Sequence, residues 1–173
     1  MPGEDHGVAE KEVGMKPVRL ATVWLSGCSG CHMSLLNLHG GLLDLLAGAD
    51  LVYSPLMDCK EYPEGVDIVL VEGAVGTVDN REMALLIRSR TRQVISLGDC
   101  ACYGNVSALR NPAGREQTLG TVYGRTQPSP AADFLEQQVL PLHQIIAVDA
   151  FIPGCPPEPE QIRTALLRLL PPR

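Results

Sequence analysis

The chain has 173 residues, of which 45% are hydrophobic and 20% are charged, and its formal net charge is -6 at pH 7. This length and apolar content suit one domain with a full hydrophobic core. The acidic balance argues against a nucleic-acid surface, which needs clustered basic residues, because the 14 Lys and Arg residues form no run.

Residues 1–17 do not have the pattern of a targeting segment. They hold four acidic residues but no apolar run and no twin arginine, so neither a signal peptide nor a transit peptide is predicted. No stretch approaches the ~18–20 unbroken apolar residues of a membrane helix. We therefore expect a flexible N-terminal segment over residues 1–17, a single domain over residues 18–173 and a cytoplasmic location.

Short apolar runs predict the strands. Nearly continuous apolar stretches are typical of strands that are covered on both faces. In chain order the predicted strands are residues 18–25, 51–57, 66–71, 94–97 and 145–152. Pro55 places the second of them near an edge of the sheet, and Trp24 is expected in the core.

Apolar residues at helical spacing predict helices between these strands. The predicted helices are residues 31–38, which resume at 42–47 after two glycines, then 80–90, 131–139 and 160–170. Asp79 is a good N-cap for the helix at 80–90. Residues 104–130 read as a long Gly- and Pro-rich excursion with room for one short helix. Strands that alternate with helices predict a doubly wound, parallel α/β sheet.

Several reactive side chains come just after predicted strands. They are Cys28, Cys59, Glu72, Cys100 and Cys155. In a parallel sheet the carboxyl ends of the strands share one rim, where such folds bind ligands. We therefore expect these residues to gather at that rim.

Four cysteines from three loops suggest a metal centre. Thiols stay reduced in the cytosol, so ligands or core residues explain the cysteines better than disulfides do. Cys28, Cys31, Cys100 and Cys155 could hold zinc or a [4Fe–4S] cluster. Structural zinc sites usually use two local C-x-x-C pairs, whereas Cys100 and Cys155 stand alone, so the spacing favours the cluster. Neighbouring glycines would let the backbone approach it.

The site residues resemble the small subunit of [NiFe] hydrogenases. The motifs that carry this resemblance are Cys28-Ser29-Gly30-Cys31, Glu72-Gly73, Gly98-Asp99-Cys100-Ala101 and Pro153-Gly154-Cys155-Pro156-Pro157. They occur in order, and the resemblance covers residues 18 to about 165. The related cluster subunit of quinone-reducing complex I has adjacent cysteines in the first motif, so the C-x-x-C here favours the hydrogenase branch.

The resemblance implies a flavodoxin-like fold and a set of ligands. By position, Cys28, Cys31, Cys100 and Cys155 correspond to ligands of the proximal [4Fe–4S] cluster. That cluster takes electrons from a Ni–Fe centre in a separate large subunit, so the resemblance predicts no catalytic residue in this chain.

The chain is similar to the short small subunit of cytoplasmic, bidirectional NAD-reducing hydrogenases. It ends 18 residues after Cys155 and has no cysteines for the further clusters of longer relatives. The resemblance implies that electrons continue through iron–sulfur and flavin subunits of a diaphorase module, and related subunits suggest an additional FMN.

Other functions remain open at this point. The chain could be a flavodoxin-like FMN electron-transfer module with incidental cysteines, a complex I-type cluster subunit, or an adaptor that holds zinc. Cys59 is interpreted as a free thiol, and Cys102 is left out of the ligand set. His32 and Glu72 are candidates for a role beside the cluster or at an interface.

Overall fold

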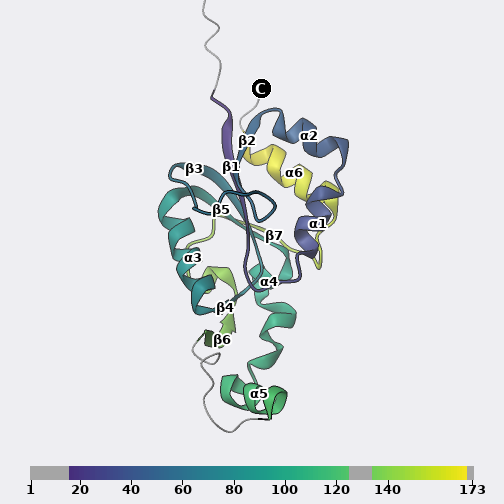
Figure 1. The fold of residues 1–173 in the computed structure, drawn as a ribbon. Helices are drawn as coiled ribbons and strands as arrows, with labels where there is room; N and C mark the ends of the chain where they lie inside the picture. Colours follow the sequence, from purple (N-terminus) through teal and green to yellow (C-terminus); the bar gives the residue numbers. More distant parts are fainter. Residues whose placement is uncertain (1–15, 125–133, 171–173) are drawn as a thin grey trace, which may run out of the picture.

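A central sheet of five parallel strands organises the chain (Figure 1). The strands are β1 (Val18–Trp24), β2 (Ala49–Tyr53), β3 (Val66–Glu72), β5 (Thr91–Leu97) and β7 (Ala150–Ile152). Their spatial order is β2-β1-β3-β5-β7, which is the flavodoxin-like order, with its switch point between β1 and β3. The structure is a computed structural model that describes residues 16–124 and 134–170. The predicted fold class is confirmed.

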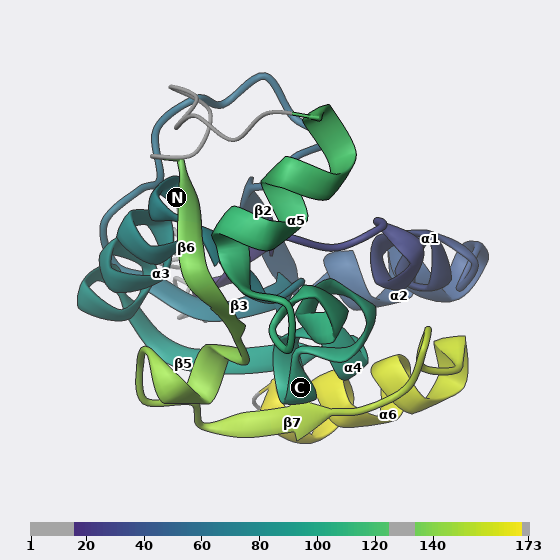
Figure 2. The same ribbon diagram turned by 90° about the horizontal axis from the view of Figure 1, so that it is seen from below.

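Helices cover both faces of this sheet (Figures 1 and 2). The described helices are α1 (Gly30–Leu36), α2 (Gly40–Leu46), α3 (Val78–Arg90), α4 (Gly98–Tyr103), α5 (Gly114–Tyr123) and α6 (Pro159–Leu169), with the 3-10 helices η1 (Asn105–Arg110) and η3 (Leu142–Gln144). Of these, α5 lies beyond the end of the sheet, beside β6. Leucine and isoleucine side chains of α1, α2 and α6 pack on one face, and α3 and η3 pack on the other.

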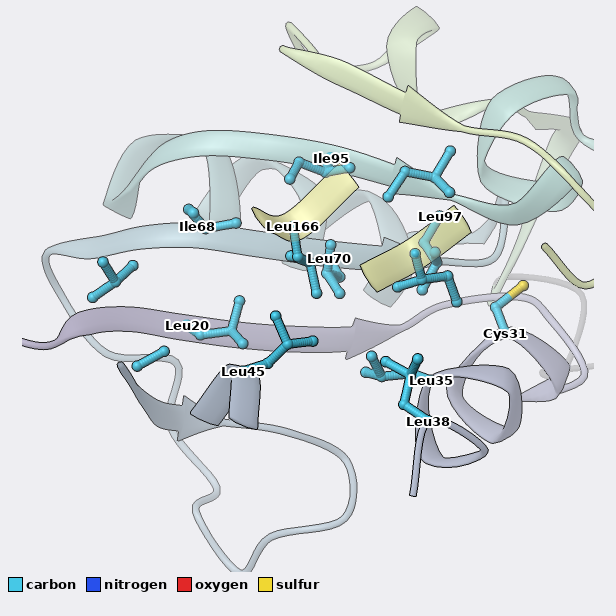
Figure 3. Packing of buried hydrophobic residues seen from close by; sticks show 14 residues of the cluster. Leu20, Cys31, Leu35, Leu38, Leu45, Ile68, Leu70, Ile95, Leu97 and Leu166 are labelled. Atoms are coloured by element: carbon cyan, nitrogen blue, oxygen red, sulfur yellow. The ribbon is translucent and has the colours of Figure 1, made fainter. Parts of the chain in front are cut away.

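Alternation along the strands divides the core into two layers. In β3, Ile68 and Leu70 pack toward α6, whereas Val69 and Val71 pack toward α3. All four are fully buried, as expected for a central parallel strand. Figure 3 shows the first layer, in which Cys31 lies at the edge of the leucine cluster and its sulfur turns away from the leucines.

Most predicted elements are found, with shifts at their ends. The strand β2 lies at the edge of the sheet, as predicted from Pro55. The helix break after α1 lies at residues 37–39, and Gly40 and Gly41 begin α2 instead of interrupting a helix. Thr77 is the N-cap of α3, since its side chain accepts a hydrogen bond from the Asn80 amide, whereas Asp79 lies in the first turn. The expectation for Trp24 is wrong, because its side chain is 48% exposed.

The segment after α4 differs from the prediction. The described part of residues 104–130 contains two helices, η1 and α5, where a long loop with room for one short helix was predicted. Residues 125–133 lie outside the described residues, and the predicted helix at 131–139 is replaced, where it is described, by the strand β6 (Leu135–Leu140). This strand pairs antiparallel with β4 (Val75–Thr77). The last predicted strand, residues 145–152, is shortened to β7, because residues 145–149 form a turn in which the Ile145 and Ile146 amides donate to the Leu142 carbonyl.

The β6 strand owes part of its position to Asn111. The Asn111 side-chain amide donates to the Val139 carbonyl at 2.8 Å, and its Oδ1 accepts from the Val139 amide at 2.8 Å. We predict that Asn111→Ala lowers the free energy of unfolding by about 1–3 kcal/mol, because it leaves a backbone donor and a backbone acceptor unpaired. Urea unfolding of the purified protein measures this, with the exposed Asn37→Ala as the control; equal stability of the two variants would contradict it.

No helix in the described part of the chain is long and apolar enough to cross a membrane.

Candidate metal centre

The loops after β1 and β3 are tied together at the switch point. The Leu25 amide donates to the Glu72 carbonyl at 2.8 Å, and Ser26 and Ala74 exchange two backbone hydrogen bonds of 3.0 and 2.9 Å. Gly73 has φ +94°, and a Cβ there would lie 2.8 Å from the Leu25 carbonyl carbon. Glycine is therefore required at this crossing, which fixes the start of the C-x-x-C loop.

The loops after β5 and β7 are joined in a similar way. The Asp99 amide donates to the Gly154 carbonyl at 2.9 Å, and the Asp99 Oδ1 accepts from the Gly154 amide at 2.8 Å. A Cβ at Gly98, where φ is +81°, would lie 2.2 Å from the Cys31 Sγ. Cys31 thus packs directly against the start of α4, which carries Cys100, and Asp99 of α4 is hydrogen-bonded to the loop that carries Cys155.

The four predicted ligand cysteines are close enough to interact electrostatically. Burial raises the pKa of the Cys31 thiol well above its usual range, and the charges of Glu72, Cys100, Cys28 and Cys155 raise it further. Burial also raises the pKa of Cys100, whereas a hydrogen bond from Ser107 lowers it. Four thiolates repel one another unless a cation or a cationic iron–sulfur core lies between them.

The site is buried on one side and open on the other. Cys31 is buried, Cys100 is half-buried, and Cys28 and Cys155 are exposed. The Asn105 side-chain amide donates to the Cys155 Sγ at 3.4 Å. The first turn of η1 therefore supplies a polar group to the open side of the cysteine cluster.

Glu72 and His32 form a buried pair beside Cys31. The Glu72 carboxylate accepts hydrogen bonds from the Cys31 amide at 3.3 Å and the His32 amide at 2.9 Å, and it also contacts the His32 Nδ1. Burial raises the pKa of Glu72, but the hydrogen bonds from His32 and Cys31 outweigh it and hold this pKa below its usual value. Glu72 is therefore a carboxylate at neutral pH.

The other two cysteines stand apart from these contacts. Cys59 is exposed, and its thiol donates to the Glu61 carbonyl at 3.3 Å. Cys102 is fully buried, and its thiol donates to the Ser96 carbonyl in β5 at 3.7 Å. Burial raises the pKa of Cys102 to about 11, so it behaves as a core thiol.

The donor set fits an iron–sulfur cluster. Its four soft thiolate donors come from the three segments that follow β1, β5 and β7, and Gly98 keeps space where a side chain would collide with the Cys31 sulfur. Among the described residues, no group of three or more His, Cys, Asp or Glu side chains is arranged to hold a metal ion. The fit therefore rests on the donors and on the loops that carry them.

Comparisons with known proteins define the class of this chain. Residues 28–169 match the family described as NADH ubiquinone oxidoreductase, 20 Kd subunit. The chain belongs to this family.

Particular relatives are hydrogenase subunits. The chain is 34% identical over 156 residues to the delta subunit of the NAD-reducing hydrogenase HoxS of Cupriavidus necator, covering 84% of this chain and 75% of the relative. It is 40% identical over 161 residues to one subunit of an F420-non-reducing hydrogenase of Methanocaldococcus jannaschii. A chain in the crystal structure of an NAD+-reducing [NiFe]-hydrogenase superposes with a TM-score of 0.83 at 36% identity, with 90% of this chain and 92% of that chain covered. The resemblance to hydrogenase subunits predicted from the motifs is confirmed.

These relatives differ in length from this chain. The match to the Methanocaldococcus jannaschii protein covers 88% of this chain but only 56% of the relative. The chain thus spans about half the length of several curated relatives that it matches, whereas it covers nearly all of the matched chain of the NAD+-reducing enzyme.

Proposed function

We propose that this chain is the electron-transfer small subunit of a cytoplasmic, NAD-reducing [NiFe] hydrogenase. The observation that carries this proposal is the placement of Cys28, Cys31, Cys100 and Cys155 directly after β1, β5 and β7, in segments joined by the contact of Gly98 with the Cys31 sulfur and by the hydrogen bonds between Asp99 and Gly154. The identity to NAD-reducing hydrogenase subunits supports it.

In this proposal the four cysteines hold one [4Fe–4S] cluster. Such a cluster accepts and releases single electrons at a potential set by its surroundings. The chain itself supplies the thiolates, the tied loops that position them and the Asn105 amide at the Cys155 sulfur. Hydrogen is activated at a Ni–Fe centre in a separate large subunit, and a diaphorase module of iron–sulfur and flavin subunits passes the electrons on to NAD.

The surface beside the cysteines supports an obligate partner. Tyr103, Val106 and Leu109 follow Cys100 along α4 and η1, and their side chains are 65%, 65% and 74% exposed. They line an open hollow of about 410 Å³ together with Asp99, Asn105 and Ala108. Exposed apolar side chains that gather in one place are typical of protein interfaces.

We predict that the chain alone binds the cluster but does not oxidise hydrogen. Anaerobically purified chain should contain about four irons and four acid-labile sulfides, and it should reduce viologen dyes with hydrogen only after the large subunit is added. Hydrogen-driven viologen reduction by a preparation that contains no nickel would contradict the assignment of hydrogen oxidation to the large subunit. Stoichiometric zinc in place of iron would contradict the cluster.

A further inference from the structure

The His32–Glu72 pair is the most buried charged contact beside the cysteines. The side chain of His32 is 5% exposed and that of Glu72 is 2% exposed. The two residues lie 40 positions apart in the sequence, one in the first turn of α1 and the other at the end of β3. The pair therefore connects the C-x-x-C loop to the centre of the sheet.

Three N–H groups surround the Glu72 carboxylate. Two are the backbone amides of Cys31 and His32, and the third is the His32 Nδ1, which must carry the hydrogen because a carboxylate can only accept. A buried carboxylate needs such donors, since the loss of water costs several kcal/mol per ion. The imidazole of His32 thus supplies a side-chain donor that holds Glu72 against the turn containing Cys31.

The Glu72 carboxylate and its donors also change the electrostatic potential at the cysteines. The negative charge of Glu72 acts on the Cys31 thiol, and the potential of an iron–sulfur cluster depends on nearby charge and on hydrogen bonds. A carboxylate near the cluster makes reduction of the cluster less favourable, because the added electron is also negative. An N–H dipole directed at that carboxylate weakens this effect.

We propose that His32 is a positioning residue for the metal centre: its ring holds the Glu72 carboxylate on the amides of Cys31 and His32, and so sets the reduction potential of the cluster. This inference rests on the proposed function, because it requires a cluster on the four cysteines. The Nε2 of His32 is buried without a hydrogen-bond partner among the described residues, so the contact with Glu72 is the polar contact that fixes the ring.

The test is a redox titration of the cluster, followed by EPR, in the anaerobically purified full chain with any subunits that co-purify. Glu72→Gln removes the negative charge and should raise the potential. His32→Leu removes the ring donor and, in a titration at a pH high enough to keep Glu72 ionised, leaves the carboxylate less compensated and should lower the potential. His32→Asn, whose amide can replace Nδ1–H, should stay near the wild type.

The sign of the shifts decides the inference. The exposed His39→Ala serves as the control. Shifts of the same sign in Glu72→Gln and His32→Leu, or no shift beyond that of the control, would overturn it. If the His32→Leu variant does not bind the cluster, the Glu72→Gln variant still tests the inference. An unchanged cluster potential in Glu72→Gln would then overturn it, because the inference requires the Glu72 charge to affect that potential. A wild-type chain without iron would instead show that the proposed function itself is wrong.

Discussion

Replacing Cys155 with Ala is expected to abolish the cluster, with iron and sulfide falling from about four of each per chain to near zero. Cys155 lies on a loop that no other ligand shares, so no neighbouring thiol can take its place. The variant should also unfold at a much lower temperature, because a cluster bound across three loops contributes its binding energy to folding. Iron and sulfide analysis and thermal unfolding under anaerobic conditions measure both effects.

Cys59→Ala is the matched control for this loss. Cys59 is solvent-exposed like Cys155, but its thiol donates to the Glu61 carbonyl. We expect this variant to keep full iron content and the stability of the wild type. Full iron content in Cys155→Ala, or equal losses in both variants, would show that the four-cysteine ligand set is incorrect.

Apolar runs in the sequence predict the parallel sheet because a buried strand must be apolar on both faces. Val66–Glu72 is the clearest example, and it forms the central strand β3. For Leu135–Leu140 the local pattern favours a helix, although its mixed polar and apolar residues fit either structure. It forms a strand because β4 and the side chain of Asn111 offer it partners far away in the sequence, and local pattern does not contain that information.

The candidate site, too, could be predicted from the sequence only in part. Strand ends predict that Cys28, Cys100 and Cys155 share one rim, because topology alone brings them there. The pairing of His32 with Glu72 could not be predicted in this way, since it depends on how α1 packs against the end of β3. The available signals were a histidine directly after a ligand cysteine and a glutamate at the end of the most apolar strand.

Removing the diaphorase module from the native complex is expected to abolish hydrogen-driven NAD reduction and to leave hydrogen-driven reduction of an artificial dye intact. The reason is that the proposed ligand set assigns Cys28, Cys31, Cys100 and Cys155 to one site, while Cys59 and Cys102 make other contacts. A single cluster of this kind can pass electrons to a dye at the surface, but NAD needs a hydride, which is flavin chemistry.

Both activities should be measured on the same preparation, before and after the diaphorase subunits are removed. Adding those subunits back should restore NAD reduction, which separates loss of the module from damage to the cluster. If the remaining complex of this chain and the large subunit still reduced NAD, electrons would reach NAD without the diaphorase. The proposed role of this chain as a relay between the Ni–Fe centre and the diaphorase would then have to be abandoned.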